Sequence, residues 1–76
     1  MELREIKQEN VKVNFTGREL DVLALLAEGK TNSEIGKALF ISVHTVKAVL
    51  EKIYEKIGCH NRVQASVFAL QNKILN

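Results

Sequence analysis

The stretch TNSEIGKALFISVHTVKAVLEKIYEKI, residues 31–57, decides the fold because it contains two amphipathic helical patterns separated by almost nothing. The first pattern begins at a capping residue, Thr31, and runs to Leu39, and the second begins after Ser42. Only the dipeptide Phe-Ile is left to join them. Two short helices joined by so tight a turn must cross at a steep angle, which is the arrangement of a helix-turn-helix unit.

The side chains of this stretch meet the packing demands of such a unit. A small residue is needed where the two helices approach each other, and Gly36 supplies it. Apolar residues are needed around that point: Ile35, Leu39, Ile41, Val46 and Val49. At 100° per residue, one side of the second helix collects Val46, Leu50, Ile53 and Ile57. The opposite side collects His44, Lys47, Ala48, Glu51 and Glu55. A protruding helix about 10 Å across fits the major groove of DNA.

Two further helices are expected, one on either side of this pair. A Thr-x-x-Glu capping box at Thr16 opens the first, and an Asn-x-x-Gln sequence at Asn61 opens the second. Gly29 and Gly58 stand where a left-handed residue ends a helix. The sequence therefore predicts an all-α, compact four-helix domain with a central helix-turn-helix. The expected helices are about 17–28, 32–40, 43–57 and 62–72.

The domain is expected to begin near residue 15 and to include the rest of the chain, residues 15–76. Residues 1–14 have balanced charges, sparse apolar residues and no capping signature, so we expect a linker or an N-terminal arm. A chain of 76 residues has room for one compact domain.

Composition excludes several classes of function. The single cysteine, Cys59, excludes an internal disulfide, and the two histidines are too few to complete a zinc site with it. No catalytic triad, glycine-rich phosphate loop or metal cluster is present, so we expect neither an enzyme, nor a cofactor, nor a small-molecule ligand. No apolar run is long enough to span a bilayer, and the N-terminus lacks the core of a signal peptide, so we expect a cytoplasmic protein without a membrane partner.

The net charge of +2 is weak support for a nucleic-acid partner, but its distribution is more informative. Residues 1–29 carry four basic and six acidic side chains, whereas residues 30–76 carry seven basic and three acidic ones. The basic part of the chain is the part that contains the helix-turn-helix pattern.

Residues 15–65 resemble the LuxR-type (GerE-like) helix-turn-helix domain, as in the C-terminal output domain of NarL-type response regulators. The matching motifs are FT-x-RE (15–19), VLALLAEG (22–29), TNSEI (31–35), LFIS (39–42), TVK (45–47) and KIG-x-x-x-R-x-QA (56–65). The resemblance implies sequence-specific binding of double-stranded DNA in bacterial transcription regulation. It leaves open whether the chain is the output domain of a two-component response regulator or a stand-alone regulator.

The resemblance also implies roles for individual residues. The base-contacting positions fall at Lys47, Ala48 and Glu51. The phosphate-contacting positions fall at Lys30, Thr31, Asn32, His44, Thr45 and Lys56. The fourth helix commonly pairs with its copy in a homodimer on DNA, and the candidates for that contact are Val63, Val67 and Leu70. RNA polymerase is a further partner that such a role allows.

Some positions depart from the family pattern or have a second interpretation. Val49 stands where relatives often have a histidine near the DNA backbone, and the outer face of the third helix is unusually acidic. Lys47 and Glu51 could instead pair with each other at i,i+4, and Arg62 could tie its helix to a neighbour. The alternative function is therefore a helical protein-interaction module that kept the fold and lost DNA binding.

Overall fold

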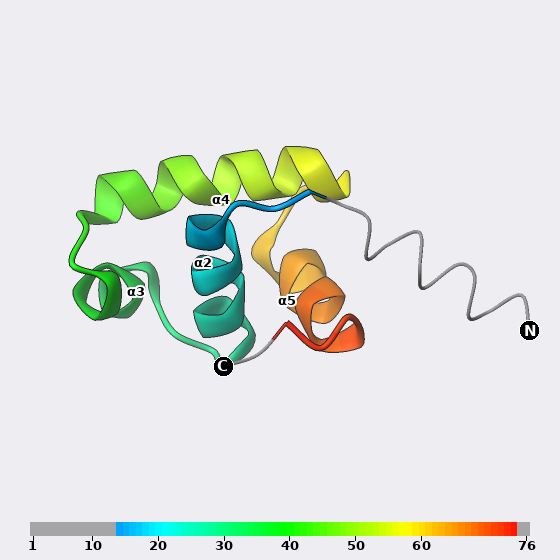
Figure 1. Ribbon diagram of the computed structural model, residues 1–76, viewed down its shortest axis with the longest axis horizontal. Coiled ribbons are helices and arrows are strands. Elements are labelled where there is room, and N and C mark those ends of the chain that lie inside the picture. The colour runs from blue at the N-terminus through cyan, green and yellow to red at the C-terminus, as the bar shows by residue number, and fades with distance from the viewer. Residues whose placement is uncertain (1–13, 75–76) are drawn as a thin grey trace, which may run out of the picture.

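The computed structural model describes residues 14–74, and its elements are all α-helices over that range. They are α2 (Gly17–Ala27), α3 (Asn32–Leu39), α4 (Val43–Ile57) and α5 (Arg62–Gln71). Because all of these elements are helices, the all-α prediction is confirmed for the described residues. Each helix boundary lies within one residue of the predicted one. Figure 1 shows α4 lying across the other three helices, which all pack against the same side of it. The predicted arm, apart from Asn14, lies outside the described residues.

Every helix begins with a side-chain cap, as predicted. Thr16 and Thr31 form complete capping boxes, in which the hydroxyl accepts from the backbone N–H three residues on and a glutamate accepts in return. The Ser42 hydroxyl accepts from the N–H of Thr45 at 3.0 Å. These caps satisfy backbone donors that a helix leaves unpaired at its start, and they explain why the sequence marked the boundaries so closely.

The predicted capping box of α5 is only half correct. The side chain of Asn61 accepts from the N–H of Gln64 at 2.9 Å, as expected. The return bond, however, is donated by the N–H of His60, and not by that of Asn61, to Gln64 Oε1 at 2.9 Å.

The core lies between α2, α4 and α5 and is closed by Ile35 from α3. Its fully enclosed side chains are Val22, Leu23, Leu26, Ile35, Val46, Leu50, Ile53, Ala65 and Ala69. Three members of the predicted α4 stripe are buried, and the fourth, Ile57, is half-buried against the core. The most extensive helix pairing joins α2 to α5, where two alanines let the backbones approach closely. Phe68 is half-buried, with its ring edge-on to that of Phe15 at 6.0 Å between centroids, and Phe15 packs against the core.

Gly36 is required by the turn between α3 and α4. A Cβ atom at this position would lie 2.7 Å from the backbone carbonyl oxygen of Ile41. The same turn is closed by the N–H of Ile41, which donates to the Gly36 carbonyl at 2.9 Å. The small residue therefore makes room for the backbone of the turn, which brings α4 steeply across α3.

Phe40 ends α3 in a backbone conformation that glycine or asparagine normally occupies. Its φ and ψ are 60° and 42°, in the left-handed region. Its side chain is 94% exposed, so burial of the ring does not compensate for the strained backbone. A left-handed conformation costs an ordinary residue about 1–2 kcal/mol, and asparagine tolerates it better.

We therefore expect Phe40→Asn to raise the free energy of unfolding by about 0.5–1 kcal/mol. Chemical denaturation measured by circular dichroism tests this, with Phe40→Ala as the control because alanine also disfavours the left-handed region. A loss of stability in Phe40→Asn would show that the exposed ring contributes packing that outweighs the backbone strain.

Candidate nucleic-acid interface

The outer face of α4 is an exposed polar surface of the helix-turn-helix unit. The other three helices pack against the opposite side of α4, so this face stands clear of them (Figure 1). The three predicted base-contacting residues, Lys47, Ala48 and Glu51, are all exposed on it. Among the described residues, the alternative ion pair between Lys47 and Glu51 is not formed. Both side chains are therefore available to a partner.

The N-termini of α3 and α4 carry the predicted polar contacts to phosphate. Thr31 and Ser42 each cap the third N–H of their helix, so the first backbone donors of each helix have no acceptor within it. The Thr45 hydroxyl lies 3.0 Å from that of Ser42, and His44 beside it is exposed. Exposed N–H groups and the positive end of the helix dipole make such termini suitable for anions.

A groove of about 190 Å³ runs beside α4 on the side of α3 and α5. It is lined by Asn32, Lys47, Leu50, Glu51, Tyr54 and Arg62. Arg62 Nη1 donates to Asn32 Oδ1 and Nη2 donates to the Lys30 carbonyl oxygen, both at 2.7 Å. The structural interpretation of Arg62 is thus confirmed, because it ties the start of α5 to the start of α3. This tie brings Asn32 into the same groove as Lys47.

A second groove, of about 250 Å³, lies on the other side of α4, against the start of α2. It is lined by Thr16, Arg18, Glu19, Thr45, Ala48, Val49 and Lys52. Within residues 14–74 neither Arg18 nor Lys52 has a carboxylate partner. Neither cation can be singled out from the sequence, because each resembles an ordinary solvated side chain on its own helix. Only the folded chain brings them to one groove, around the position where relatives often have a histidine.

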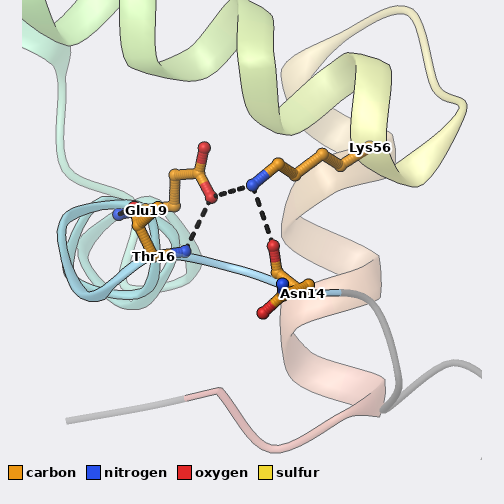
Figure 2. A network of polar contacts seen from close by, with 4 residues as sticks. All are labelled: Asn14, Thr16, Glu19 and Lys56. Atoms are coloured by element: carbon orange, nitrogen blue, oxygen red, sulfur yellow. Dashed lines mark hydrogen bonds and ion pairs between the residues drawn. The ribbon is translucent and has the colours of Figure 1, made fainter.

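Lys56 lies at the C-terminal end of α4 and has partners inside the protein. Its ammonium donates to Glu19 Oε1 at 2.7 Å and to the Asn14 carbonyl oxygen at 2.8 Å (Figure 2). The same glutamate oxygen accepts from the Thr16 N–H at 2.9 Å. This network joins α4 to the start of α2, about two helical turns from the base-facing residues. The structure therefore assigns Lys56 a structural role that the sequence did not reveal.

The electrostatics of Glu19 follow from this network. The residue is only 5% exposed, and burial by itself raises the pKa of its carboxyl. The bond from Lys56, the backbone bond from Thr16 and the charge of Lys56 together outweigh burial and leave the pKa below its ordinary value of 4.5. Glu19 is therefore charged at neutral pH.

The predicted dimer residues of α5 form an exposed apolar surface. Val63, Val67 and Leu70 are 68%, 44% and 52% exposed. Two of them, Val63 and Val67, also line a groove of about 370 Å³ that extends to the end of α4. Cys59 is half-buried at the same groove and packs against the core.

No group of three or more histidine, cysteine, aspartate or glutamate side chains among the described residues could hold a metal ion. None of the described helices is long and apolar enough to cross a membrane.

Comparison with known proteins adds a family and several relatives. The family described as "Bacterial regulatory proteins, luxR family" matches residues 13–69. The transcriptional regulatory protein LiaR of Bacillus subtilis is 48% identical over 63 residues, which are 83% of this chain and 30% of LiaR. The response regulator protein VraR of Staphylococcus aureus is 33% identical over 75 residues, 99% of this chain and 36% of VraR.

A third relative is named as a transcriptional activator. The transcriptional activator protein PhzR of Pseudomonas fluorescens is 41% identical over 66 residues, which are 87% of this chain and 27% of PhzR. The chain thus spans between 27% and 36% of the length of these three relatives.

Proposed function

The chain belongs to the luxR family of bacterial regulatory proteins, and from that premise we propose that it binds double-stranded DNA sequence-specifically to regulate transcription. The observation that supports this most directly is the uncovered outer face of α4, with the capped N-termini of α3 and α4 beside it. A helix presented in this way fits the major groove, while helix N-termini suit the phosphates at its edge.

In this proposal each side chain has a defined chemical task. Lys47 donates to guanine O6 or N7, Glu51 accepts from cytosine N4, and Ala48 touches a thymine methyl group. The polar contacts to phosphate come from Lys30, Thr31, Asn32, His44 and Thr45. Arg18 and Lys52 join this set because both line the groove beside Ala48 without a carboxylate partner among the described residues. Lys56 is left out because its ammonium already has two oxygen partners.

The functional assembly is proposed to be a homodimer on a two-part DNA site. Its support is the exposed apolar surface of Val63, Val67 and Leu70 on α5. The names of LiaR, VraR and PhzR support a role as the output domain of a response regulator or another transcriptional regulator. RNA polymerase is a further candidate partner for such a regulator.

A salt-titrated binding assay on duplex DNA tests the proposed function. Fluorescence anisotropy with labelled duplexes, starting at about 50 mM salt, should give measurable affinity that falls linearly in log–log form as salt rises. The slope reports how many phosphates are neutralised. Undetectable binding at low salt would overturn the proposal and favour the protein-interaction module, which the acidic Glu51 and Glu55 on the outer face would suit.

We expect Lys47→Ala to cost about 1–3 kcal/mol of binding free energy on the preferred duplex, because a bidentate contact to guanine is lost. The preference for one base pair should disappear with it, which a panel of single-base duplex variants measures. Lys37→Ala is the matched control, since Lys37 is an exposed lysine in the last turn of α3 and lines neither groove beside α4. A uniform loss over all sequences would instead make Lys47 a phosphate contact.

A further inference from the structure

We propose that Arg62 is a positioning residue for DNA binding, which orients the side-chain amide of Asn32 so that its NH₂ group can donate to a phosphate. This inference rests on the proposed function, and it deepens the role of the groove between α3, α4 and α5. Arg62 itself need not touch DNA. It acts through the 2.7 Å bond from its Nη1 to Asn32 Oδ1.

The orientation of the amide follows from the chemistry of its partner. A guanidinium carries only donors, so the amide atom that faces Arg62 must be the carbonyl oxygen, and the NH₂ group must face away from it. Phosphate oxygens only accept hydrogen bonds. An amide turned the other way would set its donors against the guanidinium and its oxygen towards the phosphate. The contact with Arg62 therefore decides whether Asn32 attracts or repels the DNA backbone.

The guanidinium is itself held in place at a second point. Nη2 donates to the Lys30 carbonyl oxygen at 2.7 Å, directly before the cap of α3. The N–H of Lys30 in turn donates to the Leu25 carbonyl oxygen at 3.1 Å, so this loop is fastened to the end of α2. Arg62 is half-buried at the start of α5 and is thus a clamp between a fixed loop and the first residue of α3.

The position of the clamp links it to base reading. Asn32 and Arg62 line the same groove as Lys47 and Glu51. A donor fixed on this wall would lie beside the base-contacting residues, where the DNA backbone flanks the major groove. Both bonds of the clamp join segments that are distant in sequence, and neither belongs to the hydrogen bonds within α3. A change in the clamp should therefore alter DNA binding without unfolding α3.

Asn32→Asp separates positioning from a purely structural role. The carboxylate keeps an acceptor for Arg62, adds a charge-assisted bond and suits the first turn of a helix, so thermal stability should be retained or rise. DNA affinity at about 100 mM salt should nevertheless fall at least about tenfold, because an acceptor replaces the donor. Ser33→Asp is the matched control, since it adds the same charge to the same turn at a side chain that Arg62 does not hold.

The affinities of Asn32→Asp and Ser33→Asp can support or overturn the proposal. A larger loss of affinity in Asn32→Asp than in Ser33→Asp, with both proteins folded, supports the proposal. Equal losses, or wild-type affinity in folded Asn32→Asp, would overturn it. If the wild-type protein itself does not bind DNA in the same titration, the proposed function fails first, so the two failures are distinguishable.

A double-mutant cycle adds a second readout. In an Arg62→Ala background the amide is free to turn, so Asn32→Ala should weaken binding at least about fivefold less than it does in the wild type. Equal effects of Asn32→Ala in the two backgrounds would show that Arg62 does not orient the amide.

Discussion

Gly36→Ala is expected to lower the free energy of unfolding by about 3 kcal/mol, the upper part of the range for overpacking a tight site. Intrinsic helix propensity alone predicts the opposite, a gain of up to about 1 kcal/mol, because alanine is the better helix former. The steric effect wins because the new Cβ would lie 2.7 Å from the Ile41 carbonyl oxygen. That atom belongs to the backbone of the turn and cannot rotate away, so α4 must shift relative to α3.

Gly17→Ala provides the control for this result. A Cβ at Gly17 would meet nothing within 4 Å. Gly17 is the first residue of α2, so alanine fits its helical backbone. The substitution should raise the free energy of unfolding by about 0.4–1 kcal/mol, because alanine lowers the conformational entropy of the unfolded chain. Urea denaturation of both variants measures the contrast in sign. A stable Gly36→Ala protein would mean that the turn has another conformation of similar energy.

Lys56→Met is expected to destabilise the domain by a similar amount, about 3 kcal/mol. Removing one partner of a buried ion pair costs about 3–5 kcal/mol because the other charge is left without compensation. The lower end applies here, since the Lys56 side chain is 35% exposed and solvent already screens part of its charge. Glu19, with a side chain only 6% exposed, would keep its capping bond from Thr16 but lose its cation.

The pH dependence of this loss identifies its cause. The pKa of Glu19 is lowered in the folded wild type, so its contribution is present above the ordinary value of 4.5 and is lost as the pH falls through the folded pKa. Protonation removes the charge that lacks a partner in Lys56→Met. The stability difference between the two proteins should therefore narrow below pH 4.5. Glu34, whose pKa is also lowered, is common to both proteins and cancels.

A constant difference across this pH range would show that Lys56 stabilises by packing alone. The double variant Glu19→Gln/Lys56→Met offers an independent check. Its glutamine keeps an oxygen for the Thr16 N–H without leaving a buried charge, so it should be more stable than Lys56→Met itself.

The features that could be predicted from the sequence are those encoded locally. Caps act over three residues, so Thr16, Thr31 and Ser42 fixed the helix starts closely. The two-residue turn and the position of Gly36 predicted the crossing of α3 and α4. The exposure of Lys47 and its neighbours on α4 followed from helical periodicity, and the family resemblance supplied their predicted roles.

What could not be predicted depends on contacts between distant segments or on the absence of a local signal. Glu19 and Lys56 meet only when α4 crosses the start of α2, so the lysine looked like any cation near DNA. The grouping of Arg18 with Lys52 in one groove has the same origin. The left-handed conformation of Phe40 could not be predicted from the sequence, because glycine or asparagine, and not phenylalanine, normally adopts it.

The pairing of α2 with α5 has a consequence for how the chain acquires its fold during synthesis. The helix that completes the core against α2 is the last of the four to leave the ribosome. Until Ala65 and Ala69 arrive, α3 and α4 are the only other helices among the described residues that can cover the apolar face of α2. The nascent chain should therefore form its locally capped helices early, yet close its core in one late step, when the segment between α2 and α5 becomes a loop.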